Sequence, residues 1–224
     1  MLRVLLVTAA LSLLVSTVAR AQPSPRRFVG AAAGMSTLSA DARSEITPAG
    51  VDVSLYKPDN GPALNLFVGL HLSDYVTIQA NYVWNGNEVA LTSVRASDAG
   101  PAFYEQPRTA SQHALVGDLL AYFRERRSAV RPYLSVGLGV VRLETSDAGR
   151  SRVRNATLPP TNPPATQPLL RVAVGIDVAL GPGWRARYSF SESVSGNSIS
   201  AQLSPPGQRN LANFQNLFGV VRAF

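Results

Sequence analysis

The 224-residue chain contains no cysteine, a single lysine, Lys57, and two histidines, His71 and His113. The absence of cysteine excludes disulfide bonds, thiolate chemistry and a lipid anchor attached through a thiol. Two histidines so far apart do not have the spacing of a zinc site, and the chain has no glycine-rich phosphate loop. We therefore expect neither a metal nor a cofactor.

Long apolar runs are also missing, except near the N-terminus. Arg3 precedes a largely apolar stretch from Val4 to Val18, and Ala19-Arg20-Ala21 places small residues at the two positions that a signal peptidase reads. This order is typical of a secretory signal peptide, and the stretch is shorter than the ~20 residues of a spanning helix. We predict cleavage after Ala21, which leaves residues 22–224 as one domain.

The formal net charge is +7, carried almost entirely by arginine. Nucleic-acid-binding proteins gather their cations on one face or patch. Here the arginines are scattered through turns and alternating segments, so we expect no nucleic-acid partner. After the signal peptide no apolar run of 18 residues occurs, and a chain without such a run must cross a membrane as a closed barrel if it crosses at all.

Several segments alternate apolar residues with polar or small ones. In the clearest segment the apolar residues are Leu170, Val172, Val174, Ile176, Val178 and Leu180. The same pattern covers residues 64–72, 76–85, 133–140 and 184–191, and residues 28–37, 112–123 and 214–224 are further candidates. This period predicts strands with one apolar face, most of them near the ~9–11 residues that cross a bilayer.

The connections between these segments alternate in length. The short ones are Ser73-Asp74, Arg124–Ala129 and Gly181–Gly183; the long ones are Leu38–Gly61, Val94–Arg108, Ser146–Thr166 and Ser198–Gln208. Outer-membrane barrels have this arrangement, with tight periplasmic turns and extended outer loops. The predicted fold class is all-β: an eight-stranded antiparallel up-and-down transmembrane β-barrel.

Alternation alone does not say which face points outward, because a soluble lipocalin-like barrel also alternates, with its apolar face inside. Here the polar face is rich in small residues, such as Gly137, Gly139 and Gly175. Glycine weakens strands, so a surface in water has no need of it, whereas in the narrow interior of an eight-stranded barrel small residues relieve crowding. We therefore place the apolar face toward lipid, with the soluble barrel as the alternative.

Aromatic residues lie on the apolar face, near strand ends. Tyr82 and Trp84 end a strand beside an outer loop, whereas Trp184 begins one beside a short turn and Tyr188 follows on the same face. Tryptophan and tyrosine concentrate at membrane interfaces. We predict that these four residues form an aromatic girdle.

The segment Val130–Val140, with its Pro-Tyr pair and two spaced glycines, resembles a strand motif of small outer-membrane β-barrel proteins, the OmpA-like or porin-like superfamily. This resemblance implies a Gram-negative outer-membrane location. The chain's end also resembles theirs, and implies that Phe218, Val220 and Phe224 form the signal read by the barrel-assembly machinery. Arg222 departs from the pattern, since that position is usually apolar or aromatic.

Charged residues gather on the predicted inner face. Pairing strands about the turn at Gly181–Gly183 places Asp177 opposite Arg187. The predicted barrel-interior ionic cluster consists of Asp118, Arg171, Asp177, Arg185 and Arg187. Because enclosed charges must be paired, we favour an ionic plug that fills the barrel over a gated polar path.

The segment His71-Leu72-Ser73-Asp74 resembles the His-x-Ser-Asn motif of lipid A-deacylating barrels, which use a nucleophilic triad. Asp74 departs from the asparagine, no acid lies at the expected spacing, and the motif falls on a periplasmic turn, away from lipid A. We therefore predict no catalysis.

The favoured hypothesis is a structural or surface-interaction role through four long extracellular loops. A narrow porin for small solutes is the main alternative, followed by a lipid A-modifying enzyme and a soluble periplasmic ligand-binding barrel. Expected partners are outer-membrane lipids, lipopolysaccharide and the barrel-assembly machinery, and we expect a monomer.

Overall fold

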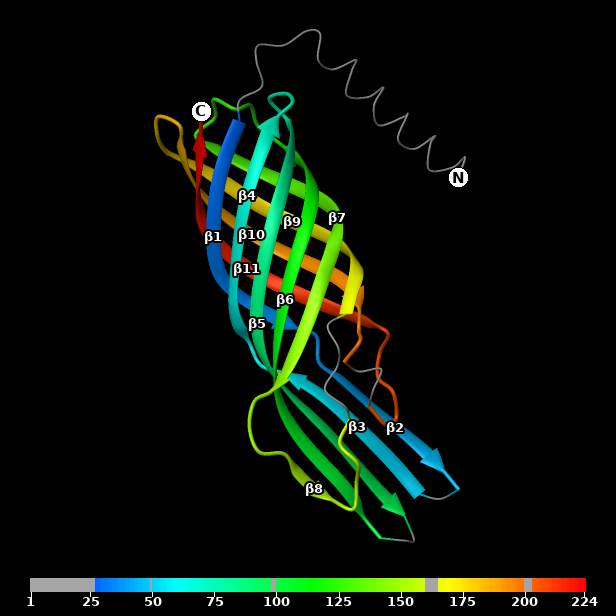
Figure 1. Ribbon diagram of the computed structural model, residues 1–224. Coiled ribbons are helices and arrows are strands. Elements are labelled where there is room, and N and C mark those ends of the chain that lie inside the picture. Colours follow the sequence, from blue (N-terminus) through cyan, green and yellow to red (C-terminus); the bar gives the residue numbers. More distant parts are fainter. Residues whose placement is uncertain (1–26, 49, 98–99, 160–164, 200–202) are drawn as a thin grey trace.

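The computed structural model describes residues 27–48, 50–97, 100–159, 165–199 and 203–224. The predicted cleavage after Ala21 lies outside these ranges. Every regular element within them is a β-strand, and none of the described residues belongs to a helix long and apolar enough to span a bilayer. Figure 1 shows the strands wrapped into one tilted barrel with a sheet extending from one end.

Antiparallel strands close the barrel in a ring of eight. In ring order they are β1 (Arg27–Leu38), β4 (Gly61–His71), β5 (Val76–Ser97), β6 (Ala102–Tyr122), β7 (Val130–Asp147), β9 (Ala165–Gly181), β10 (Trp184–Gly196) and β11 (Asn210–Ala223). The ring closes where β1 pairs with β11, with Phe28 opposite Ala223. This confirms the predicted eight-stranded barrel.

Three tight connections lie at the end of the barrel where β1 begins and β11 ends. They span residues 72–75, 123–129 and 182–183, in agreement with the predicted short connections. The backbone N–H of Phe224 donates to the carbonyl of Arg27 at 3.0 Å, so the described termini meet there. We call this the turn end and the opposite end the loop end; the turn end is at the top of Figure 1.

The loop end is more regular than the sequence predicted. The loop expected over Val94–Arg108 is wrong, because β5 and β6 continue through most of it and have 22 and 21 residues. The region 38–61 contains a hairpin of β2 (Asp41–Thr47) and β3 (Gly50–Pro58), and β8 (Arg152–Arg154) lies within the region 146–166.

These additions form a second sheet beyond the barrel, in the order β2-β3-β5-β6-β8. We call it the projecting sheet; it lies at the bottom of Figure 1. Its inner face packs against the connection between β10 and β11, and the two form a hydrophobic core. The core consists of Leu38, Tyr56, Val89, Leu91, Tyr104, Ala110, Leu143, Ile199, Leu203 and Leu211. This core explains why the strands continue past the length that a bilayer requires, since burial of apolar side chains stabilises them there.

The apolar face of the barrel points outward. On β9, Leu170, Val172 and Val174 are 46–48% exposed, whereas Arg171 and Asp177 are 2% and 1% exposed. A soluble barrel would have the opposite arrangement. The prediction of a lipid-facing apolar surface is therefore confirmed, and the alternative of a soluble ligand-binding barrel is wrong.

The closed ring gives a direct expectation for behaviour in detergent. An SDS sample kept at room temperature should migrate faster on a gel than a boiled sample, because the continuous hydrogen-bonded ring stays compact until it is heated. Gel mobility of the purified protein measures this. Identical mobility of the two samples would contradict a closed barrel.

Candidate functional site

Polar and charged side chains occupy the middle of the barrel interior, beside three small clusters of buried apolar side chains. The cavity bounded by Asp118, Arg171 and Arg187 has a volume of only about 10 Å³. A single water molecule needs roughly that much space. The middle of the barrel is therefore packed solid rather than hollow.

Asp177 and Arg187 form the central ion pair of this interior, in the register predicted from the sequence. The Arg187 guanidinium donates to both carboxylate oxygens, with Nε–Oδ1 at 2.7 Å and Nη2–Oδ2 at 2.8 Å. Tyr122 donates its hydroxyl to Asp177 at 2.8 Å, and the Gln79 carbonyl accepts from Arg187 at 2.7 Å. Bidentate geometry with further hydrogen bonds is what makes a buried ion pair tolerable.

A second buried pair joins Arg171 to Asp118, with Nη1–Oδ2 at 3.2 Å. Asn81 donates to the same carboxylate oxygen at 3.0 Å. Gly137 lies opposite on β7, and a Cβ at this position would collide with the Asp118 carboxylate. The glycine at 137 is therefore required by the ion pair, which explains part of the small-residue pattern of the inner face.

Arg185 lies apart from the predicted cluster. Its guanidinium donates to the carbonyls of Arg126 at 2.6 Å and Ser128 at 3.2 Å, both on the connection between β6 and β7. Because Arg185 is the second residue of β10, its side chain reaches the mouth of the barrel rather than its middle. The prediction that Arg185 joins the interior pairs does not match this geometry.

Arg131 is an interior residue that sequence reasoning missed. It is 1% exposed, lies opposite Asp177 in the pairing of β7 with β9, and places its guanidinium 3.7 Å from the centre of the Tyr122 ring. Its position two residues before Tyr133, on the inner face of the recognised motif, was the available signal. Stacking on Tyr122 supplies a cation–π contact in place of a carboxylate.

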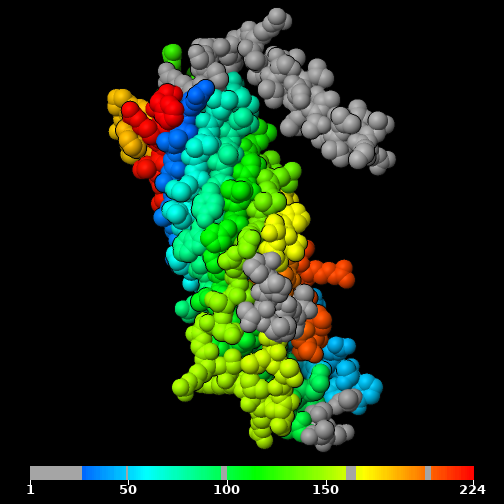
Figure 2. All heavy atoms as spheres, in the orientation of Figure 1, coloured from blue at the N-terminus to red at the C-terminus, as the bar shows by residue number. Residues whose placement is uncertain are grey.

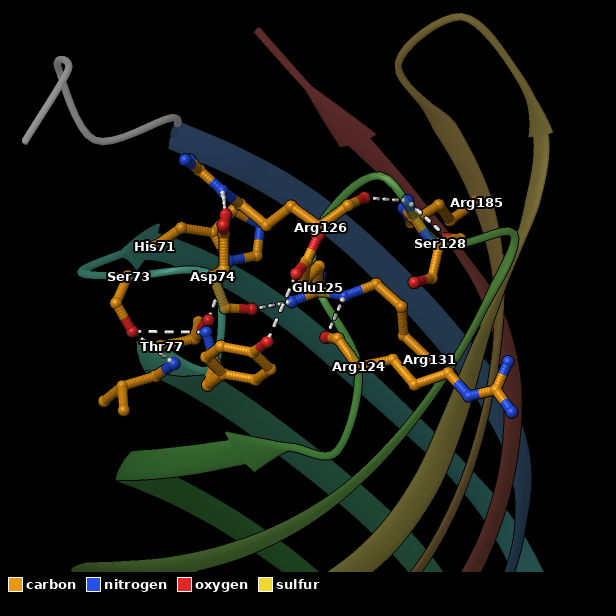
Figure 3. A network of polar contacts seen from close by, with 12 residues as sticks. His71, Ser73, Asp74, Thr77, Arg124, Glu125, Arg126, Ser128, Arg131 and Arg185 are labelled. Atoms are coloured by element: carbon orange, nitrogen blue, oxygen red, sulfur yellow. Dashed lines mark hydrogen bonds and ion pairs between the residues drawn. The ribbon is translucent and has the colours of Figure 1, made fainter.

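Arginines also tie the turns together at the turn end (Figure 3). Arg126 donates to the Asp74 carboxylate at 2.7 Å, and Arg131 donates to the Asp74 carbonyl at 2.8 Å. Arg185, on β10, donates to the backbone carbonyl of Arg126 in the connection between β6 and β7. The network thus links the connections 72–75 and 123–129 and joins the second of them to the start of β10. A cavity of about 100 Å³ remains among Arg126, Arg131 and Arg185.

In the described part of the chain, the contacts of His71 and Ser73 stabilise the backbone around the His71-Leu72-Ser73-Asp74 segment. The Ser73 hydroxyl accepts the backbone N–H groups of Tyr75 at 3.1 Å and Val76 at 2.9 Å, which fixes the turn. His71 Nδ1 lies 2.7 Å from the Thr77 hydroxyl. Ser73 and His71 therefore serve the turn and the strand pairing, rather than each other.

At the loop end, two of the predicted girdle residues contact neighbours on β6. Tyr82 places its hydroxyl 2.8 Å from His113 Nδ1, and Trp84 donates its ring N–H to Ser111 at 3.2 Å. These polar contacts satisfy the polar atoms of otherwise apolar rings. This combination suits the boundary between lipid and water.

At the turn end, the Arg222 guanidinium lies 5.1 Å from the centre of the Trp184 ring and donates to the Pro182 carbonyl at 2.8 Å. Tyr188 lies four residues beyond Trp184, roughly 13 Å along the strand, and donates to Asn216 at 3.0 Å. Tyr188 is thus inside the apolar band, whereas Trp184 marks its edge.

The outward face of β11 continues to the end of the chain. Phe218, Val220 and Phe224 are 67%, 44% and 68% exposed, so all three point away from the interior. Arg222 occupies the same face, at the position where it contacts Trp184. The departure from the family pattern at this position therefore leaves the alternation of the strand intact.

The outer face of the projecting sheet is exposed and largely apolar. Its most exposed large apolar residue is Ile46, at 84%, which lies opposite Val51. Val51, Val53 and Val94 are each 40% exposed, and Val53 is paired with Val94 across β3 and β5. We call this surface, together with Leu55, the apolar face.

Strand β8 adds a basic edge to the apolar face. Arg154 is paired with Phe103 and Arg152 with Glu105, so both arginines lie on the same side as the valines. Arg152 forms an exposed ion pair with Glu105 at 3.4 Å. An apolar surface bordered by cations thus projects from the loop end.

The comparisons with known proteins address the whole chain. The family described as outer membrane protein beta-barrel domain matches residues 7–222. No curated protein matches.

Solved structures share the fold at low sequence identity. Neisserial surface protein A has a TM-score of 0.51 and 16% identity, covering 88% of this chain and 97% of that one. The outer membrane protein OprG from Pseudomonas aeruginosa has a TM-score of 0.52 and 13% identity, covering 91% and 97%. At these identities the likeness concerns the fold alone.

The central ion pair leads to a prediction on stability. Asp177→Asn leaves Arg187 buried without its counter-charge and should lower the free energy of unfolding by ~3–5 kcal/mol. The matched control is Glu144→Gln, which breaks an exposed pair with Arg142 and should cost at most ~1 kcal/mol. Urea unfolding in lipid vesicles, followed by tryptophan fluorescence, measures both free energies. Equal effects of the two substitutions would show that the interior ion pair contributes no more to stability than the exposed one.

The turn-end network leads to a prediction on acid titration. The hydrogen bond from Arg126 holds the pKa of the Asp74 carboxyl below its ordinary value. The stabilisation linked to this shift is therefore complete above the ordinary pKa and is lost as the pH falls through the lowered one. NMR titration should show the pKa of Asp74 rising in Arg126→Gln and moving less in Arg127→Gln; an equal response to both substitutions would contradict the specific contact.

Proposed function

The chain belongs to the outer membrane protein beta-barrel family, and on this premise we propose that it is a non-catalytic surface-interaction protein whose barrel anchors the projecting sheet. The apolar band of the barrel lies in the bilayer. The turn end faces the periplasm and the loop end faces outward, as tight turns and long connections do in this class of barrel.

The apolar face of the projecting sheet carries this proposal. Exposed apolar surfaces of this kind on water-facing regions mark interaction sites, because leaving them in water is unfavourable. Val94 lies ten residues beyond Trp84 on β5, roughly 33 Å along the strand. Ile46 and the other two valines lie on the strands beside it, so lipid does not account for their exposure. The hydrophobic core beneath them holds the face rigid, which lowers the entropic cost of binding.

The packed interior argues against the alternative of a narrow porin. The central cavity of about 10 Å³ is too small for a solute, and the cavity of about 100 Å³ among the arginines of the turn end lies beyond this packed centre. The contacts of Ser73 and His71 likewise favour a structural role over lipid A modification. Both observations support an anchor rather than a conduit or an enzyme.

Lipid partners fit the outward surface at both interfaces. At the loop end Arg142, whose side chain is 55% exposed and pairs with Glu144, faces outward beside His113, where the phosphates of lipopolysaccharide would lie. The exposed Phe218, Val220 and Phe224 on β11 suit recognition by the barrel-assembly machinery. We propose that the barrel functions as a monomer, surrounded by these lipids.

The test uses cells that display the protein. Compared with wild type, Val51→Ser/Val53→Ser/Val94→Ser should lower attachment to octyl-coated glass and to a layer of the same cells by about a hundredfold, since each of the three buried valines contributes roughly 1 kcal/mol to binding. The control Ala42→Ser/Thr92→Ser alters small residues of the same sheet face. Equal attachment by all three, together with ion conductance of the purified protein in planar bilayers, would replace the proposal with the porin.

A further inference from the structure

The lipid-facing surface of the barrel contains a groove that the surface-interaction role does not use. It has a volume of about 980 Å³ and lies over the turn-end halves of β4, β5, β6 and β7 and the first residues of β1, on the face of the barrel that Figure 2 presents. Ala80 and Gly117 are paired neighbours at its floor. Val68 and Leu138, which are 54% and 70% exposed, flank them on the adjacent strands and form the walls.

Gly117 is a glycine without a packing reason. A Cβ at this position would meet only the Leu138 carbonyl oxygen, at 3.9 Å, which is an ordinary contact. By contrast, a Cβ at Gly137 or Gly139 would collide with a neighbour. Because glycine weakens a strand, its presence at 117 is explained by the space that it keeps open on the lipid side.

The groove has a cation at its turn-end boundary. Arg27 lines this boundary beside Phe224, and its side chain forms no ion pair with any described residue. Toward the loop end, Ala80 also lines a shallower depression of about 440 Å³ together with Leu66, Tyr82 and Leu115. An apolar channel along the strands therefore ends at a positive charge where the periplasmic headgroups lie.

We propose that this groove binds one anionic glycerophospholipid of the periplasmic leaflet. An acyl chain lies over Ala80 and Gly117 between the walls of Val68 and Leu138, and the phosphate is bound by Arg27. An amphipathic anion matches this groove in both of its parts, because its acyl chain fits the apolar walls and its phosphate complements the cation at the turn-end boundary. The site is independent of the projecting sheet.

The test uses the full chain in vesicles that contain phosphatidylglycerol with a photoactivatable group on one acyl chain. Labelling should concentrate on the peptides of β5 and β6 around Ala80 and Gly117. Gly117→Leu fills the groove and should lower this labelling about tenfold or more. The matched control Ala33→Leu adds the same bulk to an outward-facing residue of β1 away from the groove and should leave the labelling unchanged.

The headgroup contact is tested separately. Arg27→Gln should weaken retention of phosphatidylglycerol about fivefold in native mass spectrometry, while retention of uncharged diacylglycerol stays the same. Heat-modifiable mobility confirms that each variant has folded. Labelling spread evenly over all lipid-facing strands, or unchanged by Gly117→Leu, would overturn the proposal. It would also be overturned if sedimentation showed wild type as a dimer and Gly117→Leu as a monomer, because the groove would then be a contact between two barrels.

Discussion

Closure of the backbone hydrogen-bond ring is the constraint on which the rest of this structure depends. Lipid offers no partner for a free N–H or carbonyl, so β1 must meet β11 and complete the ring. A ring of only eight strands encloses little space, and side chains that point inward must fill it. An inward charge needs compensation inside, which is why Asp177 meets Arg187 and Asp118 meets Arg171 there, while Arg131 stacks on the Tyr122 ring.

The same constraint divides the molecule into regions with different chemistry. Within the bilayer the surface is apolar and the interior holds the buried ion pairs beside small apolar clusters. In the projecting sheet one face has an apolar core and the other meets water. Strands β5 and β6 pass through both regions without interruption. Side chains on one face of a single strand therefore serve an ionic interior at one end and a hydrophobic core at the other.

Alternation and turn length predicted the ring and the facing of Asp177 and Arg187, because they fix register locally. The direction of the apolar face was predicted from the small residues of the polar face, such as Gly137 and Gly175. It did not predict the extension of β5 and β6 past Val94, since the core that stabilises them comes from Ile199 and Leu203, distant in sequence. Arg185 was placed in the cluster only because its side chain faces inward. Its position near the end of the barrel lets it donate to the connection between β6 and β7 instead. Arg131 was missed because its partner is an aromatic ring rather than a carboxylate.

The uninterrupted run of β5 and β6 from bilayer to projecting sheet has a mechanical consequence. A tethered loop transmits a pull to its anchor through single bonds at a flexible joint. Here a pull on the sheet loads the long β5–β6 ladder along its strands, so that many backbone hydrogen bonds share the force in shear. The projecting sheet is therefore a rigid extension of the barrel, and tension on it is expected to leave the strands paired.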